Sequence, residues 1–226
     1  MSILLNVPQA HPQLILGTHV TPGWLLQGGT TGGGSLRWLS GLLGDMPFEE
    51  MSAQAEEVPP GADGLLFLPY MAGERSPLWE PDARGVLLGL GYDKGKAHMT
   101  RAVMEGVAFA LQHNLDTAAS VARPEALYAV GGAAKSRVWT QIKADVCDLS
   151  VHVPGDEATT RGAAMLAGIG IGMFTDAQQA VDAMVCIERT HEPDMQTHRQ
   201  YRDMYGLYLE AIEANLPLMR RVAKGI

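Results

Sequence analysis

Short apolar runs, each bounded by glycine or proline, recur through the first part of the chain. Runs of this length that are rich in branched and aromatic side chains are typical of β-strands. They predict strands at residues 3–7, 14–16, 24–26, 65–68 and 86–88, and similar runs predict strands at 127–130 and 151–154 and an extended piece at 186–190.

Apolar residues at helical spacing predict the elements between these strands. The longest pattern runs from about His98 to Ala119, with one apolar face that packs across a sheet and with Glu105 toward the polar side. Residues 162–172 are rich in small side chains and predict a helix of the core. Further helices are predicted from Leu36, Pro47, Ser136 and Asp176, and a last one carries Tyr201, Tyr205 and Tyr208. Strands and helices alternate in the second half, so the predicted class is α/β with a mixed sheet.

The composition is that of a globular, acidic chain. Hydrophobic residues fill 46% of the 226 positions, enough to bury a full core, and the formal net charge is −8. An acidic chain without a Lys/Arg stripe argues against nucleic acid and anionic membranes as partners. No run approaches a membrane span, and the first residues lack the features of a signal peptide. Cys147 and Cys186 have no CxxC spacing, which argues against a disulfide framework or a zinc site, and we expect a cytoplasmic location.

Two glycine-rich turns are the strongest candidates for a binding site. In the first, the strand at 127–130 runs into Gly131 and Gly132, and Ser136 can cap the helix that follows. Because glycine lacks a Cβ, backbone N–H groups at such a turn can approach a phosphate or an adenosine closely. The second turn, residues 28–35, holds five glycines and three hydroxyl side chains and also leads into a helix. Each turn alone is more often an ordinary connection, but the two together favour a shared nucleotide cleft.

Other charged and histidine positions give weaker signals. The long irregular segment at residues 70–84 is either a functional loop or a surface loop whose charged residues pair with one another. These charged residues are Glu74, Arg75, Asp82 and Arg84. His98 and His113 have no partner at metal-ligand spacing, so we predict no metal site. Residues 156–160 are expected to cap the helix that follows them.

A set of spaced motifs extends over nearly the whole chain. Gly85-Val-Leu-Leu-Gly-Leu90 is followed, after seven residues, by His98-Met-Thr-Arg-Ala-Val-Met-Glu105. The other motifs are residues 68–77, residues 131–136 with Trp139, residues 158–160 with 162–164, and the tyrosine-rich last helix. Together they resemble the carboxy-terminal domain of FGGY-type carbohydrate kinases, with the likeness closest to the xylulose kinase branch.

The resemblance implies an actin/hexokinase-like fold of the ribonuclease H type, with a mixed sheet and helices on both of its faces. It implies a reaction that moves the γ-phosphate of ATP to a sugar hydroxyl with the help of Mg²⁺. Gly33 and Arg37 match family positions that contact the nucleotide. Gly132 and Ser136 match the pair around the α-phosphate and the adenosine, and Gly131 adjoins them. These are the same two turns that the residues alone had indicated.

The chain departs from the family pattern in its length and at one residue. Family members are much longer and have an amino-terminal domain that holds most of the sugar site. Residues 1–226 are therefore expected to form a single carboxy-terminal domain that lacks its first strands, its phosphate loop and the general-base aspartate, which would precede residue 1. Arg161 stands where the family usually has an apolar residue beside the adenine pocket.

The favoured hypothesis is the nucleotide-binding half of a split or truncated sugar kinase. This half would bind ATP or ADP and would be inactive alone. It would bind a sugar such as xylulose only together with the missing domain. Two alternatives stay open: a non-catalytic interaction module that docks on a separately encoded amino-terminal half, and a degraded pseudo-enzyme. Exposed sheet edges would also promote self-association.

Overall fold

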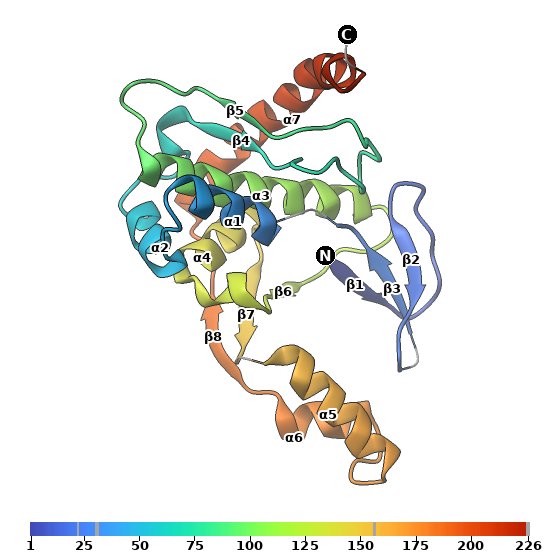
Figure 1. The fold of residues 1–226 in the computed structure, drawn as a ribbon. Coiled ribbons are helices and arrows are strands. Elements are labelled where there is room, and N and C mark those ends of the chain that lie inside the picture. Colours follow the sequence, from blue (N-terminus) through green and yellow to red (C-terminus); the bar gives the residue numbers. More distant parts are fainter. Residues whose placement is uncertain (22, 30–31, 156, 225–226) are drawn as a thin grey trace.

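Helix α3 (Lys96–Ala118) crosses the middle of the molecule, and other helices pack around it (Figure 1). The structure is a computed structural model that describes residues 1–21, 23–29, 32–155 and 157–224, so residues 30, 31 and 156 of the predicted turns and caps lie outside it. The helices that contact α3 are α1 (Gly32–Leu42), α2 (Phe48–Glu56), α4 (Arg137–Cys147) and α7 (Met195–Ala223). The core therefore surrounds a single long helix.

Burial along α3 differs from the predicted amphipathic pattern. Every residue from Thr100 to Ala110 is buried, because neighbours cover the helix on all sides in this stretch. The expectation that Glu105 lies toward a polar side is wrong, since its exposed fraction is 2%. The part of the family-like motif from Thr100 to Glu105 thus lies inside the protein.

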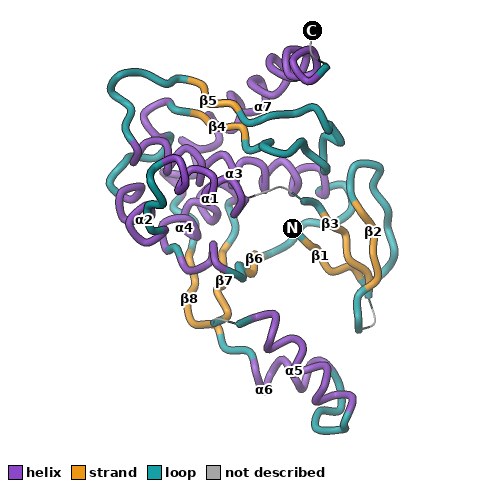
Figure 2. Tube along the Cα trace, viewed as in Figure 1, coloured by secondary structure: helices purple, strands orange, loops and turns teal. Residues whose placement is uncertain are grey.

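The described strands form three small sheets (Figure 2). The first contains β1 (Ser2–Leu5), β2 (Ile15–Thr18) and β3 (Trp24–Gln27), all antiparallel, in the order β1-β3-β2. The second pairs β4 (Leu66–Leu68) with β5 (Val86–Leu88). The third contains β6 (Ala126–Tyr128), β7 (Ser150–Pro154) and β8 (Ile187–His191), with β6 parallel and β8 antiparallel to β7. Each predicted run overlaps a strand, although the bounds differ, and the predicted mixed pairing occurs in the third sheet, whereas the first two sheets are antiparallel.

Strand β6 is less buried than expected for residues 127–130. The exposed fractions of Tyr128 and Val130 are 66% and 55%. Among the described strands β6 pairs with β7 alone, so one of its edges and part of one face stay open. The prediction of a strand is confirmed, but its full burial is wrong.

Helix α5 (Ala158–Gly170) is not a core helix. It packs against α6 (Ala177–Met184), and Figure 1 shows this pair extending away from α3. Gly168 is the one buried residue within α5, whereas Leu166 and Ile171 have exposed fractions of 45% and 76%. The prediction is wrong because small residues permit close packing but do not determine which neighbour is present. The predicted cap also differs, since Glu157 at the N-cap makes no side-chain capping bond.

The long loop after β4 packs against other parts of the chain. The Oγ of Ser76 accepts a hydrogen bond from the N–H of Gly29, at 2.6 Å, so the loop touches the glycine-rich segment before α1. Its Glu80 forms an ion pair with Arg220 of α7. Arg84 donates to the carbonyls of Pro81 and Ala83 instead of joining a network of charged loop residues. The loop therefore connects the N-terminal segment with the last helix.

The closest approach between α3 and β4 gives a testable prediction. A Cβ added at Gly106 would lie 2.2 Å from the carbonyl oxygen of Phe67, so Gly106→Ala must push the helix from the strand. We expect the free energy of unfolding to fall by about 1–3 kcal/mol, as for other overpacked core positions. Urea unfolding followed by circular dichroism measures this change.

Gly206, within α7, is the matched control for Gly106. A Cβ there meets no atom within 4 Å, and alanine is the better helix former, so Gly206→Ala should raise the free energy of unfolding by about 0.5–1 kcal/mol. Equal effects of the two substitutions would contradict the proposed contact between Gly106 and Phe67.

Candidate functional site

The turn between β6 and α4 has the geometry that the sequence predicts. Gly131 has a φ of +81°, in the left-handed region that favours glycine. A 3₁₀ turn, η2 (Gly132–Lys135), follows, and the Oγ of Ser136 accepts a hydrogen bond from the N–H of Trp139 at 3.2 Å. A Cβ added at Gly132 would meet no atom within 4 Å. The turn thus presents bare backbone to open space at the start of α4.

A cavity of about 430 Å³ lies against this turn. Three separate pieces of chain line it: the turn itself, the connection from β7 to α5, and β8. The described lining residues are 129–132, 134, 135, 153–155, 157–159, 188 and 189. This volume is within the range of pockets that hold small molecules.

The lining combines charged groups with apolar surface. Lys135 and Arg189 bring positive charge, and the N-terminus of α5, at Ala158 and Thr159, adds backbone N–H groups, to which the side chain of the N-cap residue Glu157 makes no capping bond. The positive end of a helix and basic side chains both favour a bound anion. Val130, Val153 and Pro154 supply apolar atoms beside them, with the carboxylates of Glu157 and Glu188 at the same cavity. A ligand with an anionic group and a flat apolar ring fits this lining.

The structure brings two of the five predicted site residues to the cavity. Gly131 and Gly132 line it. Ser136 begins the next helix, and its Oγ also accepts a hydrogen bond from the Oγ of Ser52 at 2.9 Å, so this side chain is used in packing α2 against α4. Gly33 and Arg37 are exposed residues of α1, which begins earlier than predicted, and they do not line the cavity. Their nucleotide contacts stay predictions.

Sequence reasoning missed the contribution of β8 to the site. Glu188 and Arg189 line the cavity because β8 pairs antiparallel with β7, which places Arg189 opposite Val153. A guanidinium N–H of Arg189 also donates to the carbonyl of Ala134, in the turn itself. No motif marks residues 186–190, and the contact exists only once the sheet has formed.

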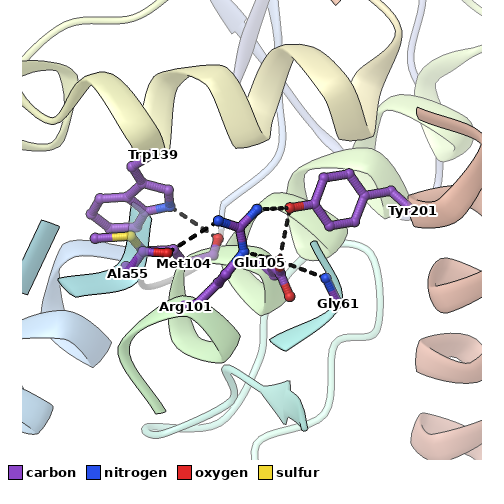
Figure 3. Close-up of polar contacts among 7 residues, drawn as sticks. All are labelled: Ala55, Gly61, Arg101, Met104, Glu105, Trp139 and Tyr201. Atoms are coloured by element: carbon purple, nitrogen blue, oxygen red, sulfur yellow. Dashed lines mark hydrogen bonds and ion pairs between the residues drawn. The ribbon is translucent and has the colours of Figure 1, made fainter. Parts of the chain in front are cut away.

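A buried polar network supports the helices behind the turn (Figure 3). Oε1 of Glu105 accepts hydrogen bonds from the Nε of Arg101 at 2.8 Å, the hydroxyl of Tyr201 at 2.7 Å and the N–H of Gly61 at 3.0 Å. Arg101 also donates to the carbonyl of Ala55 and to the hydroxyl of Tyr201. Burial raises the pKa of the Glu105 carboxyl, and its hydrogen-bond partners oppose that shift. The network links α3 to the end of α2 and to α7.

Trp139 joins this scaffold to the helix that follows the turn. Its indole N–H donates to the carbonyl of Met104 in α3 at 3.0 Å, and its ring is buried (Figure 3). The ammonium of Lys143 lies over the same ring, 4.8 Å from its centre. Trp139 thus fixes the first turn of α4, directly after the cavity-lining residues.

The described part of the chain lacks two kinds of structure. Within residues 1–21, 23–29, 32–155 and 157–224, no three His, Cys, Asp or Glu side chains lie together in a way that could hold a metal ion. In the same part of the chain, no helix combines the length and apolar character that crossing a membrane requires.

Comparisons with known proteins match most of the chain. Residues 3–171 match the C-terminal domain of the FGGY family of carbohydrate kinases. A xylulose kinase of Staphylococcus epidermidis is 34% identical over 183 residues, covering 80% of this chain and 37% of that relative. A gluconokinase of Bacillus licheniformis is 36% identical over 211 residues, covering 84% and 40%. The crystal structure of xylulose kinase from Rhodospirillum rubrum has a TM-score of 0.84 and 30% identity, covering 97% of this chain and 46% of the other.

These comparisons show the fold of the chain and how much of each relative it matches. The matched sugar kinases have the actin/hexokinase-like fold, so the predicted fold class is confirmed. The chain spans less than half the length of the relatives it matches. Glu188, Arg189 and Tyr201 lie beyond residue 171, where the family match ends.

Proposed function

The chain belongs to the FGGY family of carbohydrate kinases, and on that premise we propose that its cavity binds the adenine nucleotide of an ATP-dependent sugar kinase. The observation that carries the proposal is the position of Gly131 and Gly132. An ordinary connection between a strand and a helix needs no cavity, whereas these two glycines line one of about 430 Å³. Their backbone can therefore approach a ligand closely.

The lining residues suggest how the nucleotide is held. The phosphates would lie toward Lys135 and the N-terminus of α5, where backbone N–H groups and positive charge stabilise an anion. The base would pack on the apolar side, against Val130, Val153 and Pro154. Gly33 and Arg37 stay in the proposal as contacts from α1 that the family resemblance implies.

Phosphoryl transfer to a sugar is proposed for a protein of the relatives' full length, and nucleotide binding for these 226 residues. The relatives are named for both xylulose and gluconate, so the acceptor in our proposal is a sugar or sugar acid of this kind, with xylulose as the first choice from the sequence motifs. Magnesium would be held largely by phosphate oxygens. Because the described residues contain no cluster of metal ligands, we assign none of them to it.

The experiment that tests the proposal is calorimetric titration of the chain with ATP and ADP, repeated on Gly132→Trp. The position has open space for a Cβ, so the fold should accept the change while the indole fills the cavity. We expect the affinity for both nucleotides to fall by at least about thirtyfold, which corresponds to about 2 kcal/mol.

Gly132→Ala is the matched control, since a methyl group at the same position leaves most of the cavity free. It should bind ADP as the parent chain does, and circular dichroism should show that both variants are folded. Undiminished binding by Gly132→Trp would place the nucleotide elsewhere, and no binding by the parent chain would overturn the proposal. Among the described residues, no observation favours the interaction-module alternative.

A further inference from the structure

Arg189 connects two walls of the cavity that are far apart in sequence. It belongs to β8, which forms one wall, and its guanidinium donates to the carbonyl of Ala134 in the turn that forms another wall. This hydrogen bond therefore joins the two walls beside Gly132. Nothing in the sequence motifs assigns a role to Arg189.

His191 holds the other side of the same guanidinium. The Nε of Arg189 donates to Nε2 of His191 at 3.0 Å, and Nδ1 of His191 lies 2.9 Å from Oε1 of Gln141 in α4. Since Nε2 accepts a hydrogen bond from the Nε–H of Arg189, the proton of the neutral ring is on Nδ1, from which it donates to Oε1 of Gln141. We call Arg189, His191 and Gln141 the β8 clamp.

The β8 clamp is anchored beyond Gln141. The amide nitrogen of Gln141 donates to Oδ1 of Asp145 and to the carbonyl of Glu192, both at 2.8 Å. Asp145 in turn accepts from the N–H of Asp194, the N-cap of α7, at 2.8 Å. The turn at the cavity is thus tied through hydrogen bonds to α4 and to the start of α7.

We propose that Arg189 is a positioning residue for the nucleotide, and that neutral His191 holds its guanidinium so that the turn at Gly132 keeps its binding geometry. This inference rests on the proposed function, because it assigns a role within the same cavity. Arg189 acts through the carbonyl of Ala134, so its contribution concerns the shape of the site for the whole nucleotide and not one phosphate.

The protonation state of His191 decides whether the clamp can form. A protonated ring has no lone pair for the Nε–H of Arg189 and places a second positive charge beside the guanidinium. Among the described residues, the charged groups that act on His191 are Arg189 on the same strand and Arg137 on α4, with Glu192 next to it in sequence. Asp145 on α4 is linked to His191 through Gln141, and His152 on β7 bonds to the neighbouring Thr190. Burial, Arg189 and Arg137 lower the pKa of His191. The clamp is therefore intact at neutral pH and is lost as the pH falls through this lowered pKa.

Calorimetric titration with ADP and with adenosine separates positioning from a direct phosphate contact. In Arg189→Met, which keeps an unbranched apolar stem but removes the guanidinium, we expect binding of both ligands at neutral pH to weaken about tenfold, the effect of one charge-assisted hydrogen bond. Loss for ADP alone would mean that Arg189 contacts phosphate, and unchanged binding of both would leave it no role; either result overturns the proposal. Arg202→Met, an exposed residue of α7, controls for the change of charge.

The pH profile is a readout that a merely structural role would not move. As the pH falls below the ordinary histidine value of about 6.5 and through the lowered pKa of His191, adenosine binding by the parent chain should weaken. His191→Gln, whose amide can replace both ring contacts but cannot be protonated, should bind at neutral pH and lose the pH dependence. Persistence of the same pH step in His191→Gln would overturn the assignment.

A measurement without nucleotide distinguishes failure of the clamp from failure of the proposed function. The His191 ring resonance, followed by NMR against pH, should show a higher pKa in Arg189→Met than in the parent chain, because the neighbouring positive charge is gone. An unmoved pKa would show that the bond between Arg189 and His191 is not formed in solution. If that pKa moves but the parent chain does not bind ADP, the proposed function fails, and the positioning role fails with it.

Discussion

Replacing Glu105 by glutamine is expected to lower the free energy of unfolding by about 3–5 kcal/mol, the range for removing one member of a buried ion pair. The side chain keeps its size, but the guanidinium of Arg101 loses its counter-charge in a region that water does not reach. Tyr201 and Gly61 would then donate to a neutral amide that needs acceptors of its own. Three helices meet at this point, so all of them should lose stability together.

Urea unfolding at neutral pH measures the effect of Glu105→Gln, with Glu213→Gln as control. Glu213 is an exposed residue of α7, and its replacement should change the free energy of unfolding by less than about 0.5 kcal/mol. A Glu105→Gln chain as stable as the parent would show that the carboxylate and Arg101 are not paired inside the folded protein.

Trp139→Ala is expected to cost about 3–5 kcal/mol, as for other large aromatic side chains removed from a core. The indole has an exposed fraction of 2%, and its removal leaves a void between α3 and α4. It also removes the donor that the carbonyl of Met104 now has and the ring over which Lys143 lies. Because α4 begins directly after the cavity, nucleotide binding should weaken in the same variant.

Trp79→Ala tests whether that cost comes from burial and not from the loss of any tryptophan. Trp79 lies in the loop after β4 with an exposed fraction of 48%, although its indole N–H also donates to a carbonyl, that of Gln13. Its replacement should lower the free energy of unfolding by about 1 kcal/mol, because one hydrogen bond and a small buried apolar area are lost. Thermal and urea unfolding of both variants measure the two changes in the free energy of unfolding. Equal decreases would contradict the packing described for Trp139.

Local patterns in the sequence predicted the parts of the site that local chemistry determines. Ser136 caps α4 because a hydroxyl at the extended N-cap position can accept from the N–H three residues later, and the turn at Gly131 has a positive φ that favours a residue without a Cβ. Strand and helix assignments succeeded for the same reason, since periodicity reflects which face of an element is covered.

Contacts between distant residues could not be predicted in this way. Glu105 looked like a surface residue because its partners Gly61 and Tyr201 are supplied by other elements, and a lone acid on a helix usually faces water. Arg189 gave no signal, because its contact with Ala134 depends on the pairing of β7 and β8. Helix α5 was assigned to the core from its composition, but burial depends on which neighbours are present.

The polar residues that line the cavity are separate from the core around α3, and this has a consequence for how the protein can evolve. Lys135, Glu157, Thr159 and Glu188 line the cavity but are exposed, whereas stability rests on the buried residues around α3. Substitutions at exposed positions usually change stability by less than about 0.5 kcal/mol. Selection can therefore alter the ligand preference of this cavity through single substitutions that leave the stability of the fold almost unchanged. Duplicated copies of such a chain are then free to diverge in the ligands that they bind.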